Sequence, residues 1–215
     1  MSGKTQIVRI GPVHFQPLEW ELELVSKYLQ GHVLNAGCGN RDLRPYLLET
    51  GVERVTNYDM ASTLEGAIVG SLDAMPFAAA SFDSILCNAV LEHVTSVDAV
   101  VRELVRVLRP GGYMVLAVPF LQPFHECPLD FRRYTRDGLV ELGESAGLTS
   151  IAVHPVHSAA QTLGWIAWEI ARERKSRVLQ IVLWPIIYLA TRIWLRTDLT
   201  VLRNANTYQV VFTRQ

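Results

Sequence analysis

Short apolar runs alternate with longer amphipathic segments from Gly31 to about Gly112, and this alternation limits the fold more than any other feature of the chain. It is the βαβα pattern typical of a parallel sheet covered by helices. One helix is predicted over residues 42–50. A second is predicted to begin after Thr95, its N-cap, and to end at Arg109. Strands are predicted at residues 32–36, 54–58, 67–69, 82–87 and 113–118. The pattern indicates an α/β fold with a doubly wound, mostly parallel sheet that binds ligands at the carboxyl ends of its strands.

The remaining segments extend this fold without requiring a second domain. A helix is expected over 17–30, and another after Thr135 that ends near Gly147. Strands at 150–153 and 207–212 would bring the sheet to seven strands, and a helical insert of about 157–206 would precede the last strand. With 215 residues, 49% of them hydrophobic, we expect a single domain over 1–215.

Composition and cysteine spacing exclude several classes of protein. The high hydrophobic content excludes a disordered chain, and three well-separated cysteines exclude a disulfide scaffold, a zinc ribbon and a C-x-x-C redox pair. The first residues lack a secretory signal pattern, so a reducing, cytoplasmic location is expected. Charge is uneven: residues 1–169 carry 12 Lys and Arg against 19 Asp and Glu, whereas residues 170–215 carry 8 against 2.

A glycine turn follows the first predicted strand, at Gly37-Cys38-Gly39. Such a turn between a strand and a helix lets the backbone approach a nucleotide-like ligand closely. A G-x-G-x-x-G fingerprint would need its third glycine where Asp42 stands, and this carboxylate would face a pyrophosphate, so NAD and FAD are disfavoured. Asp59 ends the second strand, where a carboxylate can accept the hydrogen bonds of both ribose hydroxyls.

Five ordered motifs between Gly31 and Leu148 resemble the class I S-adenosylmethionine-dependent methyltransferases, especially their small-molecule and lipid methyltransferase group. These motifs are Asn35-Ala36-Gly37-Cys38-Gly39, Asp59, Gly70 to Phe77, Asn88 to Val94, and Leu108 to Gly112. The resemblance implies a Rossmann-like methyltransferase fold and S-adenosylmethionine as cofactor. Position by position, it implies cofactor-binding roles for Asn35, Gly37, Gly39, Asp59, Met60, Leu72, Asp73 and Asn88.

Two positions depart from the family pattern. Asn35 stands where the first polar residue of the motif is usually an acid, so it cannot pair ionically with the methionine ammonium. Alignment on Pro76 places Ser71, and not Leu72 or Asp73, at the usual acidic position beside the adenine.

The loop after the fifth strand, Pro119 to Thr135, is the expected acceptor side of the site. It looks like the H-x-x-P-x-D-[FY]-x-R-Y-T stretch of many poorly characterised bacterial methyltransferases. His125 is the first candidate for a proton-accepting base and Tyr134 the second, whereas a structural role is favoured for the third catalytic candidate, His93.

Three further residues of this loop are candidates for substrate binding: Asp130, Arg132 and Arg133. Either arginine would bind an anionic group of the substrate, or pair with Asp130 and hold the loop together. His125, Glu126, Cys127 and Asp130 also suggest a metal site, but no second cluster in the sequence completes it, so no metal is expected.

The leading hypothesis is a methyltransferase that acts on a small-molecule, sugar or lipid-linked acceptor. The alternative is a catalytically inactive S-adenosylmethionine-binding regulatory or scaffolding protein, which Asn35 favours and the His125 to Tyr134 loop opposes. A nucleic acid substrate is disfavoured, because Asn88-Ala89-Val90-Leu91 stands where base-directed enzymes often carry a Pro-Pro-Tyr motif.

The insert contains an apolar run, residues 178–190, with a central proline at 185. It is shorter than the roughly 20 residues that a spanning helix needs. Its basic flanks and its aromatic residues are typical of a helix that lies on a membrane surface. We therefore keep two interpretations: peripheral contact with the inner face of the membrane, and a lid or homodimer face.

Overall fold

The computed structural model describes residues 8–125, 129–194 and 203–215. The chain divides into two compact units, which are described separately. The sheet unit comprises Glu23–Pro119, His125–His154 and Tyr208–Gln215, and the helical unit comprises Met1–Leu22, Phe120–Phe124 and Pro155–Thr207. That the whole chain is one domain stays a prediction.

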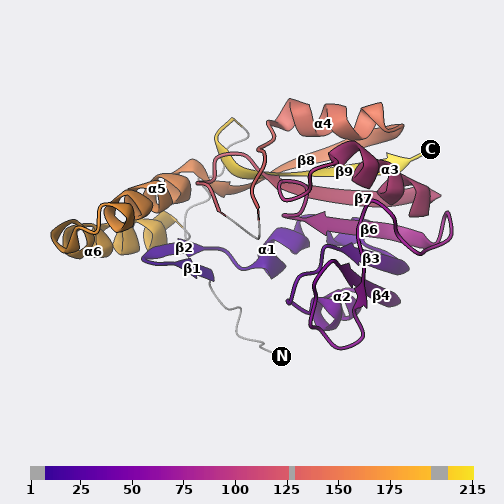
Figure 1. The fold of residues 1–215 in the computed structure, drawn as a ribbon, viewed down its shortest axis with the longest axis horizontal. Coiled ribbons are helices and arrows are strands. Elements are labelled where there is room, and N and C mark those ends of the chain that lie inside the picture. The colour runs from indigo at the N-terminus through magenta and orange to yellow at the C-terminus, as the bar shows by residue number, and fades with distance from the viewer. Residues whose placement is uncertain (1–7, 126–128, 195–202) are drawn as a thin grey trace. The chain divides into compact units, whose positions relative to one another are not determined.

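A seven-stranded sheet dominates the fold (Figure 1). Its strands are β3 His32–Ala36, β4 Arg54–Asp59, β5 Ile68–Val69, β6 Phe82–Asn88, β7 Leu108–Pro119, β8 Leu148–Ser158 and β9 Ala205–Arg214. They lie in the order β5-β4-β3-β6-β7-β9-β8, and the pairs from β5 through to β7 are parallel. The order reverses direction at β3, so the predicted doubly wound, mostly parallel sheet of seven strands is confirmed.

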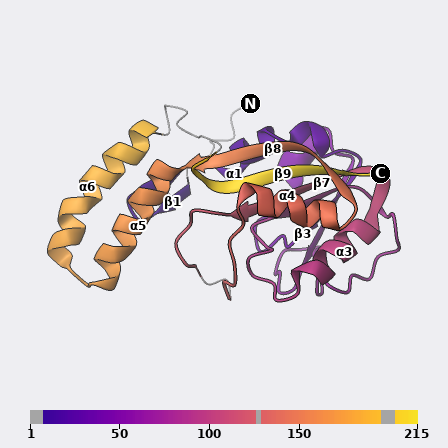
Figure 2. The same cartoon turned by 90° about the horizontal axis from the view of Figure 1, so that it is seen from above.

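Buried apolar residues explain why these segments form the sheet and its cover. Four of the five β3 residues are buried, as expected for a strand covered on both faces. The helices of the sheet unit are α2 Arg44–Glu49, α3 Val97–Val107 and α4 Arg136–Ser145. Figure 2 shows α3 and α4 along one face of the sheet. The side chain of Thr135 caps α4 by accepting a hydrogen bond from the Gly138 amide, so the predicted cap is confirmed.

Several boundaries differ from the prediction: β8 and β9 are longer than the expected 150–153 and 207–212, and α2 is shorter than 42–50. Ser96, and not Thr95, is the N-cap residue of α3. β7 begins at Leu108, because this buried side chain pairs with Phe82 and draws the segment that we expected to be a turn into the strand. The extra residues form an irregularity before the pairing resumes at Ser84, and Gly111 adopts the positive φ of +76° there.

The helix expected over 17–30 is interrupted. The structure has α1 Leu18–Glu23 and a short 3-10 turn, η1 Ser26–Tyr28. Between them Val25 is fully buried, with φ of −123° and ψ of 1°, which lies outside the helical region. Burial of this β-branched side chain overrides the local helical pattern.

The helical unit contains the predicted helical insert, as α5 Ala159–Glu173 and α6 Arg177–Trp194, together with the hairpin β1 Val8–Ile10 and β2 Val13–Phe15. Its core is made by Val13, Phe15, Trp165 and Ile187, so the two helices are held against the hairpin. Within the described residues, none of the helices has both the length and the apolar character needed to cross a membrane.

Candidate active site

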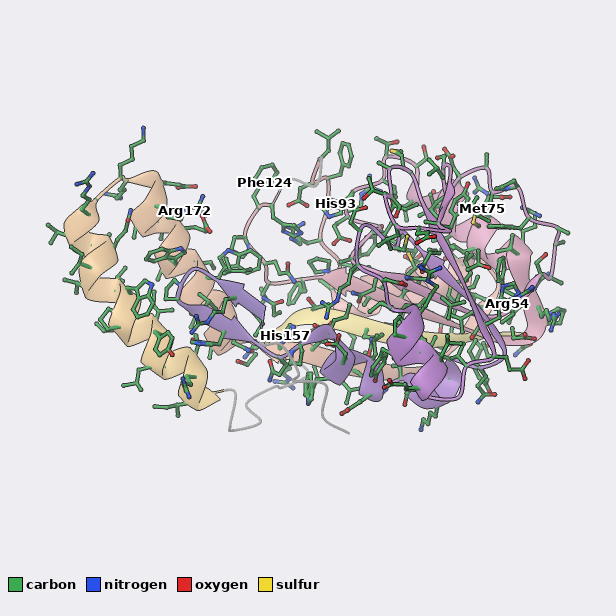
Figure 3. All side chains as sticks on the ribbon, turned by 90° about the horizontal axis from the view of Figure 1, so that it is seen from below. Arg54, Met75, His93, Phe124, His157 and Arg172 are labelled. Atoms are coloured by element: carbon green, nitrogen blue, oxygen red, sulfur yellow. The ribbon has the colours of Figure 1, made fainter. Side chains whose placement is uncertain are left out.

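The carboxyl ends of β3, β4, β6 and β7 meet at one edge of the sheet, because these strands are parallel. Gly37, Asp59 and Asn88 lie at this edge, as the sequence predicts. Figure 3 shows His93, which follows β6, at the opposite end of the sheet unit from Arg54, which begins β4. Asp59 and Asn88 thus bring polar side chains to the edge where doubly wound folds bind their ligands.

The glycine turn is held to the end of β4. The amide of Gly37 donates to the Tyr58 carbonyl at 2.7 Å, and the amide of Gly39 donates to Asp59 Oδ2 at 2.9 Å. Gly37 has φ of +73°, and a Cβ atom there would lie 2.3 Å from Val90 Cγ2. Gly39 has φ of +53°, and a Cβ atom there would meet nothing within 4 Å. Only the second glycine thus faces open space.

The carboxylate of Asp59 is fixed by backbone donors. Besides the Gly39 bond, its Oδ1 accepts from the Ala61 amide at 2.8 Å. A carboxylate has about four acceptor positions, so Asp59 keeps capacity for two further donors such as the ribose hydroxyls. The neighbouring Met60 is 68% exposed and offers an apolar side chain to a flat ring.

Asn35 belongs to a buried network of amides. Its side chain is 3% exposed and donates from Nδ2 to Asn57 Oδ1 at 2.9 Å, and Asn57 donates in turn to Asp42 Oδ1 at 3.2 Å. Hydrogen bonds from Arg44 hold the pKa of Asp42 at about 2, so this carboxylate is ionised at neutral pH. Asn35 carries no negative charge, but the ionised Asp42 lies two hydrogen bonds away, through Asn57.

The adenine-side candidates differ in exposure. Leu72 is buried, whereas Ser71 and Asp73 are exposed and joined by a 2.5 Å hydrogen bond from the serine hydroxyl to the aspartate. Asn88 is half-buried at the end of β6, and the next residue, Ala89, has a left-handed φ of +55°. Such strained non-glycine residues cluster at ligand sites, and Ala89 was not among the residues that the sequence singled out.

On the acceptor side, an ion pair orders the loop. Asp130, whose side chain is 1% exposed, forms a two-pronged salt bridge with Arg133, which lowers the Asp130 pKa to about 2. Asp130 Oδ2 also accepts from the His125 amide at 2.8 Å. The sequence left each arginine either to bind the substrate or to pair with Asp130. For Arg133 the structure shows the pair with Asp130, which holds the loop together.

His93 and His125 lie together, with ring centroids 5.4 Å apart in an edge-to-face arrangement. The Nδ1 of His93 is 2.5 Å from the Leu129 carbonyl, which fixes the orientation of the ring. The Nδ1 of His125 is 3.3 Å from Arg133 Nη2 and 3.8 Å from Asp130 Oδ2. The structure thus brings His125 and His93 into one cluster with the Asp130–Arg133 pair.

Tyr134 and Arg132 line a different cavity, of about 540 Å³, at the N-terminus of α3. Burial raises the pKa of the Tyr134 hydroxyl, and Arg132 donates to the Thr95 carbonyl at 3.2 Å. The other residues lining this cavity are Thr95, Ser96, Val97, Asp98, Ala99 and Arg102. Tyr134 and Arg132 therefore share this cavity at the N-terminus of α3.

Glu92 is the main residue that the sequence reasoning missed. Its side chain is fully buried, and both carboxylate oxygens lack a hydrogen-bond partner among the described residues. Burial raises its pKa to about 7. An acid placed directly after the apolar run Ala89-Val90-Leu91 was the available signal, because charged residues are rarely fully buried without a partner.

Part of the chain matches known methyltransferases. A family model described as "Methyltransferase domain" matches residues 34–116. The chain is 32% identical over 92 residues to malonyl-(acyl-carrier protein) O-methyltransferase of Enterobacter lignolyticus, covering 38% of this chain and 36% of that protein. It is 30% identical over 112 residues to ubiquinone biosynthesis O-methyltransferase of Bordetella avium, covering 45% and 46%. The chain thus spans less than half the length of these relatives.

Solved structures share the fold. A cyclase, SpnF, superposes with a TM-score of 0.63 at 16% identity, covering 91% of this chain and 80% of the cyclase. The Burkholderia thailandensis 1,6-didemethyltoxoflavin-N1-methyltransferase, solved with its substrate and S-adenosylhomocysteine, gives 0.60 at 16% identity, covering 92% and 79%. At this identity the likeness establishes the fold alone, and different reactions occur on it.

Proposed function

We propose that this chain, whose residues 34–116 match a methyltransferase domain, is a class I methyltransferase that transfers a methyl group from S-adenosylmethionine to a small-molecule, sugar or lipid-linked acceptor. One observation carries the proposal: the glycine turn and Asp59 lie at the same sheet edge as the ordered cluster of His93, His125 and Asp130. A binding protein without turnover would not need that second cluster, so the inactive alternative is not favoured.

The glycine turn fits the cofactor on the geometry of the chain itself. Gly39 leaves open space where a side chain would stand, and Asp59 retains acceptor positions for ribose hydroxyls. We place Met60 and Asp73 beside the adenine and Asn88 beside the methionine end. The cofactor supplies an electrophilic methyl group on a sulfonium, and the residues of this chain hold and orient the two reactants.

We propose His125 as the group that accepts the proton of the acceptor. A neutral imidazole is a suitable base near pH 7, and the Asp130–Arg133 pair orders the loop that carries it. Arg132 and Tyr134 then contact another part of the acceptor in their own cavity.

Transfer of a labelled methyl group tests this function. When the protein is incubated with cell extract and S-adenosylmethionine labelled in its methyl group, mass spectrometry should detect one class of labelled product together with S-adenosylhomocysteine. Slow release of S-adenosylhomocysteine without extract would also indicate a competent active site. Tight cofactor binding without product or release, in any extract, would support the inactive alternative.

We also propose that the protein is cytoplasmic and that its helical unit contacts the inner face of the membrane peripherally. α6 exposes large apolar side chains at helical spacing, and α5 adds a shorter stripe. The exposed residues are Val178, Ile181, Val182, Trp184, Ile186, Leu189 and Ile193 on α6, and Leu163, Ile166 and Ile170 on α5. Apolar surface on this scale marks an interaction site.

Charge favours an anionic lipid surface as the occupant. Arg172, Arg174, Lys175 and Arg177 are exposed around the turn between α5 and α6, and Figure 3 shows Arg172 near that turn. Basic residues beside an apolar helix face are attracted to anionic lipids of the cytoplasmic leaflet. A lipid-linked acceptor would then be reached at that surface.

Flotation with anionic liposomes measures this contact. The protein is expected to float with vesicles at low salt and less at high salt, because salt screens the attraction. The double variant Val178→Glu/Ile181→Glu, which changes side chains 74% and 72% exposed, should lose flotation, whereas Leu48→Glu on α2, 49% exposed, should not. Absence of flotation at any lipid composition, with a stable dimer in solution, would assign the apolar face to dimerisation.

A further inference from the structure

A buried carboxylate and two histidines converge beside the candidate active site. Glu92, His93 and His125 each offer one ligand atom, and these atoms lie within 4.8 Å of one another. Glu92 Oε1 is 3.6 Å from His93 Nε2. The sequence alone did not join them, because 31 residues separate His93 from His125 and the structure brings the loop back to the end of β6.

Glu92 supplies the observation that points to a cation. Both of its oxygens are buried without a hydrogen-bond partner among the described residues, and burying an unpaired carboxylate is costly. Its own backbone carbonyl is occupied, since it accepts from the Phe131 amide at 2.8 Å, so the loop is fastened at this residue. The nearby cation Arg133 is paired with Asp130, and His93 Nε2, at 3.6 Å from Glu92 Oε1, is too far away to donate a hydrogen bond to it.

His93 has the orientation of a metal ligand. Its Nδ1 faces the Leu129 carbonyl, so this nitrogen carries the proton and Nε2 presents its lone pair toward Glu92. Metal-binding histidines almost always donate their other ring N–H to a carbonyl or carboxylate in this way. His125 is positioned through its backbone, because its amide donates a hydrogen bond to the Asp130 carboxylate.

We propose that Glu92, His93 and His125 bind a divalent transition metal ion, most favourably Zn²⁺. Two imidazoles and one carboxylate form a ligand set of catalytic zinc sites, which use three protein ligands and keep a further position open. The open position would face the acceptor side of the active site, where it suits an oxygen of the substrate or water. This site goes beyond the proposed methyl transfer and stands or fails independently of it.

Calorimetric titration of the metal-free, untagged protein with ZnCl₂ tests the site. One ion per chain is expected to bind, and Glu92→Gln, His93→Gln and His125→Gln should each weaken binding by more than the ~10–100-fold that loss of an outer hydrogen-bond partner causes. Zn²⁺ should raise the melting temperature of the wild type and not that of Glu92→Gln. Glu92→Gln replaces the buried carboxyl group by a neutral amide of similar shape, so its metal-free form is expected to fold.

Matched controls separate this site from incidental binding. His32→Gln and Glu49→Gln change a histidine and a glutamate of the sheet unit outside the cluster and should leave zinc affinity unchanged. Absence of binding, or binding that all three cluster variants leave intact, would overturn the proposal. Since no cofactor is present in the titration, its result does not depend on methyl transfer.

Zinc and a proton compete for the same ring of His125. A bound ion takes the lone pair that the proposed base needs, so micromolar zinc is expected to slow methyl transfer and EDTA to restore it.

Discussion

Asp59→Ala is expected to lower the affinity for S-adenosylhomocysteine by at least about two orders of magnitude, measured by calorimetry. Hydrogen bonds to a charged group contribute about 1.5–3 kcal/mol each, and two ribose hydroxyls would lose their acceptor. Every 1.4 kcal/mol corresponds to about tenfold in affinity. The variant also releases the Gly39 and Ala61 amides that the carboxylate holds, so the turn itself loses definition.

Glu49→Ala, which removes an exposed carboxylate from α2, is the matched control and should bind normally. Circular dichroism and thermal melting must show that Asp59→Ala is folded. Near-wild-type affinity in a folded Asp59→Ala protein would contradict the assignment of this site. Tighter binding of NAD than of S-adenosylhomocysteine would contradict the choice of cofactor.

The two glycines of the turn should respond differently. Gly37→Val places a side chain against Val90, at a backbone φ that β-branched residues avoid, so its expected effect includes loss of stability. Gly39→Asn introduces a residue that tolerates a left-handed φ into open space. It is therefore expected to fold and to block the approach of the ligand, which makes it the cleaner companion to Asp59→Ala.

The strand pattern was predictable because it depends on local composition. β3 was predicted residue for residue, and β4 and β6 to within one residue, since each is a short segment closed by a polar residue or glycine. The glycine turn and Asp59 follow directly from those strand ends. Parallel pairing then dictates that they share one edge of the sheet.

What escaped the sequence depends on contacts between distant segments. β7 starts early because Leu108 pairs with Phe82, and no local sequence pattern predicts this pairing. The cluster of Glu92 with the two histidines forms because the loop after β7 returns to the end of β6. The local sequence Leu-Glu-His does not indicate that this loop comes close. The partner of Asn35 was hidden likewise, because Asn57 lies on the neighbouring strand.

His125→Ala is expected to lower kcat by about 10²-fold or more while leaving the affinity for S-adenosylhomocysteine within a few-fold of the wild type. The reason is geometric: His125 belongs to the acceptor-side loop, and its contacts are with Asp130, Arg133 and His93, not with the glycine turn. Single-turnover measurements with EDTA present report the role of the imidazole without interference from metal.

Neighbouring variants distinguish a proton acceptor from a residue that merely supports the loop. Asp130→Asn breaks the salt bridge to Arg133 and should reduce kcat less than His125→Ala, because the imidazole remains and only its positioning suffers. His93→Ala should act mainly through stability, since its ring is tied to the Leu129 carbonyl. A neutral His125→Ala with a large loss in His93→Ala would transfer the base to His93. Insensitivity of kcat to both would leave positioning of the reactants as the source of the rate, which methyl transfer from a sulfonium permits when the acceptor is already nucleophilic.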